Sequence, residues 1–307
     1  MSPIVSIIIP NYNHAPYLDE RIQSILNQTF QDFEIIILDD CSTDNSFEVI
    51  EKYRNNPKVS QIIYNTINTG STFIQWNKGF SLAKGKFIWI AESDDFCDNT
   101  LLETLVEKLK ENNKRTIAFC LSQFVDSKGN KISPFLKVSN NKSYNGSQFI
   151  AYYMTFGNFI NNASSALFRK NTLSYISSDY MNYKAAGDKL FWIEIAQLGE
   201  VAIINKPLNY FRQHCQKVSP TKLIDGTTFR EEFKIFEYLR LKHFINRFES
   251  FFIRNYYYLL ATNTNFCNST IKQEILRLWN NQINSIAIAK TLELMHKVIR
   301  KLRTSIF

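Results

Sequence analysis

The first hundred residues alternate short apolar runs with longer segments of mixed polarity. The apolar runs are rich in β-branched and aromatic residues and have no polar face, which is typical of strands buried between helices. These predicted strands cover residues 4–9, 33–38, 59–64 and 87–91. The segments between them repeat apolar residues at helical spacing, and the helices so predicted cover residues 17–27, 45–54 and 72–84. Strands and helices in this order predict a parallel sheet with right-handed crossovers.

Beyond residue 98 the pattern predicts further elements of both kinds. Helices are expected over residues 99–112 and 188–198, and strands over residues 117–125, 164–169 and 201–204. Residues 126–147 are rich in Ser, Asn, Lys and Gly, which indicates a mobile connection. From Thr221 the pattern is helical, with a last helical stretch over residues 271–303. We therefore expect an α/β domain over residues 1–220 and a helical region over residues 221–307.

Composition excludes several classes of protein. Of the 307 residues 45% are hydrophobic and only 9 are Gly and 7 Pro, so the chain is neither disordered nor collagen-like. The five cysteines lie far apart without metal-ligand spacing, which favours reduced thiols in a cytoplasmic protein. The N-terminus lacks the basic residues of a signal peptide, and no window reaches the roughly 20 uncharged apolar residues of a membrane span.

The net charge of +8 is unevenly distributed along the chain. Residues 221–307 contain 14 basic and 7 acidic residues, so they carry +7 of it. Aromatic and aliphatic residues recur there at helical spacing. Such helices could lie on the inner face of the cell membrane, pack against the α/β domain, or form a homodimer.

Polar residues follow each of the first four predicted strands. Because ligands of parallel sheets bind outside the carboxyl ends of the strands, we expect these loops to meet. The fourth loop contains three carboxylates, on Glu92, Asp94 and Asp95. Carboxylates this close repel one another, and a divalent cation among them would offset the repulsion. Alternatively, they cap the helix that follows. Because the cluster would repel phosphates unless metal is present, the chain is not expected to bind nucleic acid.

Four motifs, in this order, resemble the family 2 inverting glycosyltransferases, which have the GT-A fold. They are SIIIPNYN, LDDCSTDNS, NTGSTFIQWNKGFSLAKGKFIWIAESDD and AAGDKLFWIEIAQLGEVAIINKPLNYFRQH. The resemblance covers about residues 4–220. It implies a Rossmann-like, mixed but mainly parallel sheet flanked by helices. It also implies transfer of a sugar from a UDP- or dTDP-linked donor to a hydroxyl of a saccharide, such as a lipid-linked precursor of cell-surface polysaccharide.

The resemblance implies a metal site at the fourth loop. Asp94 and Asp95 match the family's DXD-like position, one near the ribose and one on Mn²⁺ or Mg²⁺, with Glu92 beside them. A cation there would stabilise the charge that develops on the leaving diphosphate. His214 in NYFRQH is either a further ligand or a hydrogen-bonded loop histidine. We expect His14 to end a turn rather than to bind a ligand.

The same resemblance implies a nucleotide site. Asp40 is expected to accept a hydrogen bond from the pyrimidine ring N–H. The other residues expected at this site are Pro10, Asn11, Tyr12, Asp39, Asp44, Asn68, Gly70, Asn77, Ser93 and Asp94. Asp44 could instead cap the helix that follows it.

One position departs from the family pattern at this site. Trp76 stands where the family often has Arg, so Lys78 or Lys84 could supply the missing contact. Alternatively, both lysines lie on a solvated helix face.

The resemblance assigns the general base to Asp188 and part of the acceptor pocket to Asn162 and Ser164. Gly187 replaces the first acid of the family's Glu/Asp-Asp motif. The predicted helix N-terminus is expected to lower the pKa of Asp188 and keep it ionised at neutral pH. Alternatively, Asp188 only caps this helix, and Asn162 and Ser164 only form a turn and a strand start.

Other functions remain open from the sequence. A nucleotidyltransferase would need a Gly-rich phosphate loop after the first strand, and PNYNHAPY has none. A catalytically inactive nucleotide-sugar-binding protein is disfavoured by the intact acidic residues. The Gln-x-x-Arg-Trp signature of processive synthases is absent from the sequence, which favours one sugar added per encounter.

Overall fold

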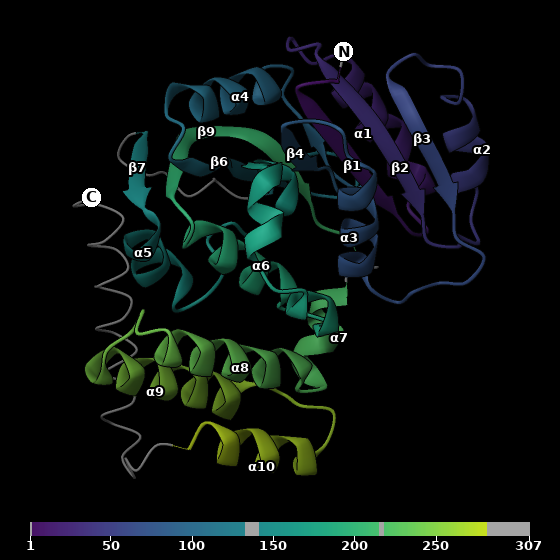
Figure 1. Ribbon diagram of the computed structural model, residues 1–307. Helices are drawn as coiled ribbons and strands as arrows, with labels where there is room; N and C mark the ends of the chain where they lie inside the picture. Colours follow the sequence, from purple (N-terminus) through teal and green to yellow (C-terminus); the bar gives the residue numbers. More distant parts are fainter. Residues whose placement is uncertain (1, 133–140, 215–217, 281–307) are drawn as a thin grey trace.

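The computed structural model describes residues 2–132, 141–214 and 218–280 of the chain. Within these residues it forms a nine-stranded mixed sheet with the order β3-β2-β1-β4-β8-β6-β9-β5, and β7 pairs with β9 (Figure 1). The strands are β1 (Val5–Asn11), β2 (Phe33–Asp39), β3 (Val59–Tyr64), β4 (Phe87–Ile90), β5 (Phe96–Cys97), β6 (Arg115–Val125), β7 (Lys142–Asn145), β8 (Ala166–Arg169) and β9 (Glu200–Arg212).

Helices follow most of the strands along the chain. Those of the α/β part are α1 (Ala15–Leu26), α2 (Ser46–Glu51), α3 (Thr72–Leu82), α4 (Leu101–Glu111), α5 (Gly146–Phe149) and α6 (Gly187–Ala196). Those that come after the last strand are α7 (Val218–Ile224), α8 (Thr227–Leu241), α9 (Arg247–Asn263) and α10 (Ser269–Leu278).

The sheet has a parallel and a mixed half. Strands β3, β2, β1 and β4 are parallel to one another, so their carboxyl ends share one edge. Strand β8 then runs antiparallel between β4 and β6, while β6 and β9 pair in parallel. This confirms the predicted mixed, mainly parallel sheet flanked by helices.

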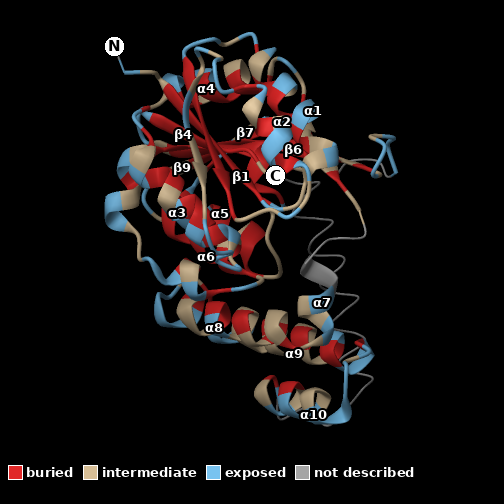
Figure 2. Ribbon diagram, turned by 90° about the vertical axis from the view of Figure 1, so that its right-hand side faces the viewer, coloured by how far each residue is buried: buried red, intermediate tan, exposed pale blue. Residues whose placement is uncertain are grey.

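The two faces of the sheet bury separate cores because successive strand residues point to opposite sides. On one face, Ile7 and Ile35 pack in a core that also contains apolar residues of α1 and α4. On the other, Ile8 and Ile36 pack with residues of α3 and α6. Helix α3 lies very close to β1, because a Cβ at Gly79 would come within 2.5 Å of Ile8. Figure 2 shows this burial concentrated in the strands.

Two predicted elements differ from the structure. Strand β3 is not buried between helices as expected, since it lies at the sheet edge and its residues are partly or fully exposed. Residues 126–147 are not a continuous loop, because Lys142–Asn145 forms β7 along β9 and a helix begins at Gly146. Residues 133–140 of that segment and residues 281–307 of the predicted helical tail lie outside the described residues.

The helices after Gly226 pack together and onto the α/β part (Figure 1). Trp279 at the end of α10 is fully buried, and its ring stacks on Tyr257 of α9. Apolar residues of α8, α9 and α10 belong to the same core as those of α3 and α6. None of the helices within the described ranges is both long enough and apolar enough to cross a membrane. Binding of this region to a membrane surface or to a second copy stays a prediction.

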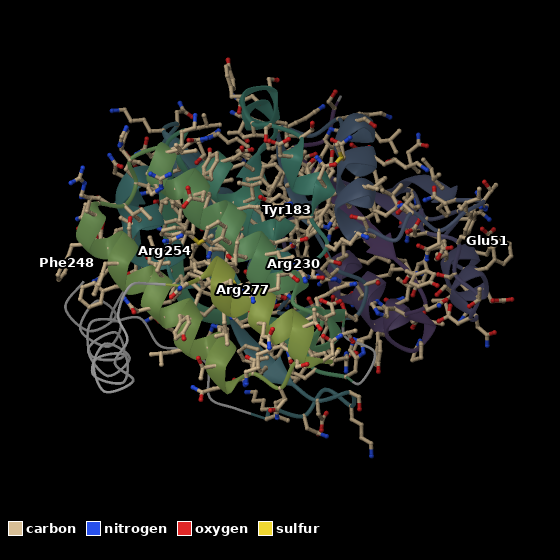
Figure 3. All side chains as sticks on the ribbon, turned by 90° about the horizontal axis from the view of Figure 1, so that it is seen from below. Glu51, Tyr183, Arg230, Phe248, Arg254 and Arg277 are labelled. Carbon is tan, nitrogen blue, oxygen red and sulfur yellow. The ribbon has the colours of Figure 1, made fainter. Side chains whose placement is uncertain are left out.

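Several basic side chains of this region have protein partners. Figure 3 shows Arg230, Arg254 and Arg277, one on each of α8, α9 and α10. Arg230 forms an ion pair with Glu274 at 2.6 Å, which joins α8 to α10. The guanidinium of Arg254 lies 5.6 Å from the ring centroids of Phe233 and Phe236, within the range of cation–π contacts. Some of the basic side chains in this region therefore form contacts between these helices.

Candidate active site

A cavity of about 730 Å³ opens at the carboxyl ends of β1, β2 and β4. The polar loops that follow these strands supply most of its lining, with further residues from the start of α3 and the end of β9. The lining residues are Pro10, Asn11, Tyr12, Asn13, His14, Asp40, Asn68, Gly70, Ser71, Thr72, Gln75, Glu92, Ser93, Asp94, Asn162, Phe211, His214 and Lys222.

The structure brings most of the predicted site residues to this cavity. Those that line it are Pro10, Asn11, Tyr12, Asp40, Asn68, Gly70, Glu92, Ser93, Asp94, Asn162 and His214. The predicted residues that do not line it are Asp39, Asp44, Asn77, Asp95, Ser164 and Asp188. Asn77 accepts a hydrogen bond from the Tyr180 hydroxyl at 3.2 Å. The contacts of the other five are described below, and ligand binding by either group stays a prediction.

Asp39 orders the loop after β2. Its carboxylate accepts hydrogen bonds from Asn11 Nδ2 at 2.7 Å and from the backbone N–H and hydroxyl of Ser42 at 2.9 and 2.6 Å. Asp44 similarly accepts from Ala15 N at 2.9 Å and Ser46 N at 3.0 Å, at the starts of α1 and α2. These contacts fix the shape of the loops around the cavity.

Asp40 connects the β2 loop to the loop after β3. The residue is 4% exposed, and its carboxylate accepts from Asn65 Nδ2 at 2.7 Å, from Thr69 Oγ1 at 2.8 Å and from Gln75 Nε2 at 2.8 Å. The Thr69 N–H also lies 3.0 Å from it. The loop that contains Asn68 and Gly70 is therefore held against the cavity by one buried carboxylate.

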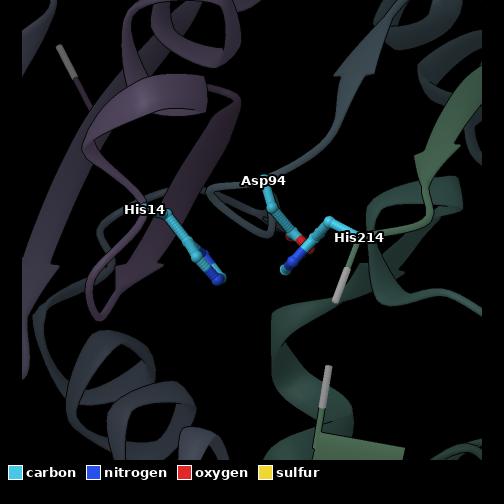
Figure 4. Close-up of side chains that lie close together, drawn as sticks. All are labelled: His14, Asp94 and His214. Carbon is cyan, nitrogen blue, oxygen red and sulfur yellow. The ribbon is translucent and has the colours of Figure 1, made fainter. Parts of the chain in front are cut away.

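His14, Asp94 and His214 come together on one side of the cavity, with potential ligand atoms within 4.8 Å of one another (Figure 4). His214 Nε2 lies 2.9 Å from Asp94 Oδ2, and His14 Nδ1 lies 2.8 Å from the Ser93 hydroxyl. The rings of His14 and His214 meet edge to face at 5.4 Å. Nδ1 of His214 is buried and has no hydrogen-bond partner among the residues that the structure describes.

This cluster has the character of a metal-binding site. Burial lowers the pKa of His14 although the nearby Asp94 carboxylate raises it, so at neutral pH the ring is a neutral imidazole that can donate a lone pair. Burial tends to raise the pKa of Asp94, but its contacts, first among them the hydrogen bond with His214, lower it overall. The donor set consists of two imidazoles and one carboxylate, and the Ser93 hydroxyl holds one of the imidazoles, that of His14. Such a set suits a divalent transition metal.

Glu92 also lines the cavity, near Asp94. Its Oε1 accepts a hydrogen bond from Trp76 Nε1 at 3.0 Å. Burial, followed by repulsion from Asp94 and Asp95, raises the pKa of Glu92 to about 8. Trp76 thus contacts the acidic loop where the family often has Arg. Of the two lysines considered as substitutes, Lys78 donates to Asn65 Oδ1 at 2.5 Å and Lys84 is exposed.

Asp95 points into the protein rather than into the cavity. It is 0% exposed, and its carboxylate accepts from Asn162 Nδ2 at 2.8 Å, Ser164 Oγ at 2.7 Å and Arg212 N at 3.0 Å. Both oxygens are therefore occupied by donors from two other segments. Asn162 and Ser164, predicted at the acceptor pocket, use their side chains to hold Asp95, and the metal role predicted for Asp95 has no cavity-facing oxygen to support it.

Asp188 lies in the first turn of α6. Its Oδ2 accepts from Asn158 Nδ2 at 2.7 Å, and its Oδ1 accepts from Lys189 N at 2.8 Å. Burial raises the pKa of Asp188 to about 6, which corrects our expectation that the helix N-terminus would lower it. The energetic reason is that desolvation of a partly buried carboxylate outweighs the stabilisation from two hydrogen bonds and the helix end.

Gly187 has a packing reason to lack a side chain. A Cβ at this position would approach Phe73 Cε2 and the Tyr180 carbonyl oxygen to 2.6 Å. Such contacts are far inside van der Waals distance, so α6 can approach α3 only with Gly here. The acid expected from the family motif at this position would not fit.

Sequence reasoning missed three residues of the site. His14 was expected only to end a turn, although its place after the first strand's carboxyl end was an available signal. Arg212 contacts the acidic loop through Nε, which donates to the Asp94 carbonyl at 2.7 Å. Arg21 of α1, fully buried, donates from Nε to the Glu92 carbonyl at 3.0 Å. Arg212 lies in the NYFRQH motif, from which a role was predicted only for His214, whereas no local pattern marks Arg21, because it acts across elements distant in sequence.

Comparison with known proteins identifies relatives of this chain. The family model described as Glycosyl transferase family 2 matches residues 6–174. Glycosyltransferase GlyG of Streptococcus pneumoniae is 35% identical over 130 residues, which cover 42% of this chain and 43% of GlyG. An uncharacterized glycosyltransferase of Haemophilus influenzae is 30% identical over 227 residues, which cover 71% of this chain and 68% of that protein. The chain spans about half the length of several curated relatives that it matches.

A solved structure shares the fold. Staphylococcus aureus TarS in complex with UDP-GlcNAc superposes with a TM-score of 0.61 at 18% identity, covering 99% of this chain and 78% of that one. This likeness confirms the GT-A fold that the four motifs predicted.

Proposed function

Because the chain belongs to glycosyltransferase family 2, we propose that it transfers a sugar from a UDP- or dTDP-linked donor to a saccharide hydroxyl, with inversion at the anomeric carbon. The observation that carries this proposal is the cavity at the parallel strand ends, which brings together the His14, Asp94 and His214 side chains and the loop held by Asp40. Carboxyl ends of parallel strands are where sheets of this type bind their ligands.

The nucleoside end of the donor would lie against the loops after β1 and β3. A cavity of about 730 Å³ is of the size that holds a compact polar ligand. Pro10, Asn11 and Tyr12 form one wall, and the loop with Asn68 and Gly70 forms another. The similarity to a protein solved with UDP-GlcNAc supports a uridine nucleotide. In this arrangement Asp40 fixes the loop after β3. That loop in turn presents hydrogen-bond acceptor atoms to the nucleoside.

His14, Asp94 and His214 would hold a divalent cation next to the donor diphosphate. Imidazole nitrogen binds transition metals better than it binds Mg²⁺, so this donor set favours Mn²⁺ over Mg²⁺. Such an ion supplies positive charge to the oxygens of the departing nucleoside diphosphate. Ser93 would orient His14 through the contact to Nδ1, and Arg212 would fix the backbone of Asp94.

Asp188 would remove the proton from the acceptor hydroxyl. A pKa of about 6 suits a general base at neutral pH, because the group is ionised yet basic enough to accept a proton. Asn158 and the Lys189 N–H hold the two carboxylate oxygens. Asn162 is four residues from Asn158 and lines the donor cavity, so the Cα atoms of the two asparagines are at most about 14 Å apart. Residues 158–162 therefore connect the proposed base to the proposed donor site.

The acceptor would be a saccharide, such as a lipid-linked precursor of a cell-surface polysaccharide, and one sugar would be added per encounter. Such an acceptor lies at the cytoplasmic membrane surface, where the basic helices after Gly226 could bring the enzyme. An inactive nucleotide-sugar-binding protein would share the donor site but transfer nothing.

The test is a screen of nucleotide sugars. UDP-, dTDP- and GDP-linked sugars are each added with Mn²⁺, with Mg²⁺ or with EDTA, and thermal unfolding and release of nucleoside diphosphate are measured. A true donor at 100 times its Kd should stabilise the fold by about 2.7 kcal/mol, and Mn²⁺ should increase the effect. The donor assignment fails if no UDP or dTDP compound stabilises the protein in any metal condition. Binding without release or transfer would favour the inactive binding protein.

A further inference from the structure

Glu231 of α8 binds the backbone of the loop that leads into Asp188. One of its carboxylate oxygens accepts from Lys184 N at 2.7 Å, and the other accepts from Ala185 N and Ala186 N, both at 2.8 Å. Glu231 is 6% exposed, so these bonds are shielded from water. A single carboxylate therefore satisfies three consecutive N–H groups directly before α6.

The loop cannot supply this acceptor itself. Ala186 occupies the N-cap position of α6 and has no side-chain oxygen, whereas Ser, Thr, Asp or Asn usually fill this role. Gly187, the next residue, has no room for a side chain. Buried N–H groups left unpaired are costly, so without Glu231 this loop would have to rearrange to reach water.

A second contact joins the same two helices. Lys189, next to Asp188, forms an ion pair with Glu232 at 2.6 Å, and their side chains are 2% and 11% exposed. Lys234 of α8 lies 5.6 Å from the ring of Tyr183 at the start of the loop. Residues before and after Asp188 are thus both held by α8, which lies below α6 in Figure 1.

We propose that Glu231 is a positioning residue for the general base, and that α8 is consequently a working part of the active site rather than an accessory helix. The inference rests on the proposed transfer reaction with Asp188 as base. Glu231 does not line the donor cavity. It fixes the backbone from residue 184 to residue 186. This in turn fixes the position from which the Asp188 side chain projects from the first turn of α6.

The proposal separates two parts of catalysis. The donor cavity is lined by the loops after β1, β2, β3 and β4, the start of α3, the end of β9, Asn162 and Lys222. Among the described residues, Glu231 forms hydrogen bonds with Lys184, Ala185 and Ala186, which are not part of this lining. Loss of Glu231 should therefore lower kcat while leaving donor binding intact. Misplacement of a reacting group by about 1 Å can cost about 100-fold in rate, so a large effect on kcat is expected.

The experiment compares three variants of the full chain. Glu231→Gln keeps the shape but replaces one acceptor oxygen with an N–H₂ group that would face backbone donors. Glu231→Asp keeps both acceptor oxygens and the charge on a shorter side chain. Glu237→Gln is the matched control, because Glu237 lies on the same helix and forms an ion pair with Arg240 on the surface. For each variant, kcat, donor and acceptor KM, UDP affinity and hydrogen exchange are measured.

We expect Glu231→Gln to lower kcat by about 10- to 100-fold with unchanged UDP affinity, and to speed exchange of the amides at residues 184–186. Glu231→Asp should restore part of kcat, and Glu237→Gln should match wild type. The proposal is overturned if Glu231→Gln keeps wild-type kcat, or if kcat and UDP affinity fall together, which would indicate a general loss of structure.

Two other outcomes are also informative. If Glu231→Gln does not fold, Glu231→Asp decides the matter by the same comparison of kcat with UDP affinity. If wild-type protein binds UDP-sugars but transfers none, the proposed function itself fails, and this is recognised before any variant is made.

Discussion

The carboxylate of Asp94 lies 2.9 Å from Nε2 of His214, although 120 residues separate the two along the chain. Asp94 follows β4 of the parallel half, and His214 follows β9 of the mixed half. The pair therefore forms only when both halves of the sheet have assembled, and it places the proposed metal site at their junction. This explains why no single motif in the sequence describes the site.

Asp188 is the residue on which the proposed chemistry depends most directly. We expect Asp188→Asn to lower kcat by about 10²- to 10⁴-fold, because a positioned general base contributes that much to the rate. UDP affinity should not change, since Asp188 does not line the donor cavity. Asp179→Asn, at an exposed position nearby, is the matched control. Transfer by Asp188→Asn within a few fold of wild type would exclude Asp188 as the base.

The pH dependence of kcat/KM should report the same group. Burial raises the pKa of Asp188 from 3.8 to about 6, with Glu232 raising it and Lys189 lowering it to smaller degrees. The base must be ionised, so kcat/KM should rise from pH 5 to pH 7 with a midpoint near pH 6 and then level off. Initial rates over pH 4.5 to 8.5 measure this. A midpoint near 4 would mean that Asp188 is better solvated than the structure indicates.

Asp188 should also lower the stability of the protein at neutral pH. A carboxyl whose folded pKa lies above its unfolded value binds more protons in the folded state, so stability falls as pH rises from about 4 to about 6. Asp188 is only partly buried, so we expect Asp188→Asn to raise the free energy of unfolding at pH 7.5 by about 1–2 kcal/mol. At pH 4 the difference should vanish. Urea unfolding at the two pH values tests this, and equal effects at both would contradict it.

The sheet and its functional edge could be predicted from the sequence for a physical reason. Strands β1, β2 and β4 are buried on both faces, so most of their residues are apolar, and this leaves an unambiguous pattern. Polar residues such as Asp40 and Asp94 immediately after them could only lie at the strand ends. Strand β7 was missed because its sequence KSYN is short and polar, and it forms only by pairing with β9.

The finer details of the site depend on contacts between distant segments. Asp94 and Asp95 are adjacent and chemically identical, yet Asn162 and Ser164 supply donors to Asp95 alone. Because neighbouring side chains leave the backbone in different directions, only one of the two carboxylates faces the cavity. The pKa of Asp188 could not be predicted either, since its main cause is burial. Burial is a property of the assembled fold, not of helix position.

The different surroundings of the two aspartates predict different effects of mutation. Asp95→Ala leaves three buried donors without an acceptor, so we expect a loss of about 2–4 kcal/mol in the free energy of unfolding. Asp94→Ala removes one contact to His214 and should cost about 1 kcal/mol or less. Urea unfolding in EDTA, where no metal contributes, measures both. If Asp94→Ala were the more damaging change, Asp95 would not be the structural member of the pair.

His14 offers the sharpest test of the proposed metal site, because the family resemblance did not predict it. We expect His14→Asn to weaken Mn²⁺ activation at least about tenfold, since one of three donors is lost. UDP affinity in EDTA should stay the same. His243→Asn is the control, because His243 is exposed and is distant in sequence from the three residues of the cluster. Its φ of 59° is a conformation that Asn tolerates. The rate is titrated with Mn²⁺ for each protein. An unchanged titration for His14→Asn would leave Asp94 and His214 as the only ligands from this cluster.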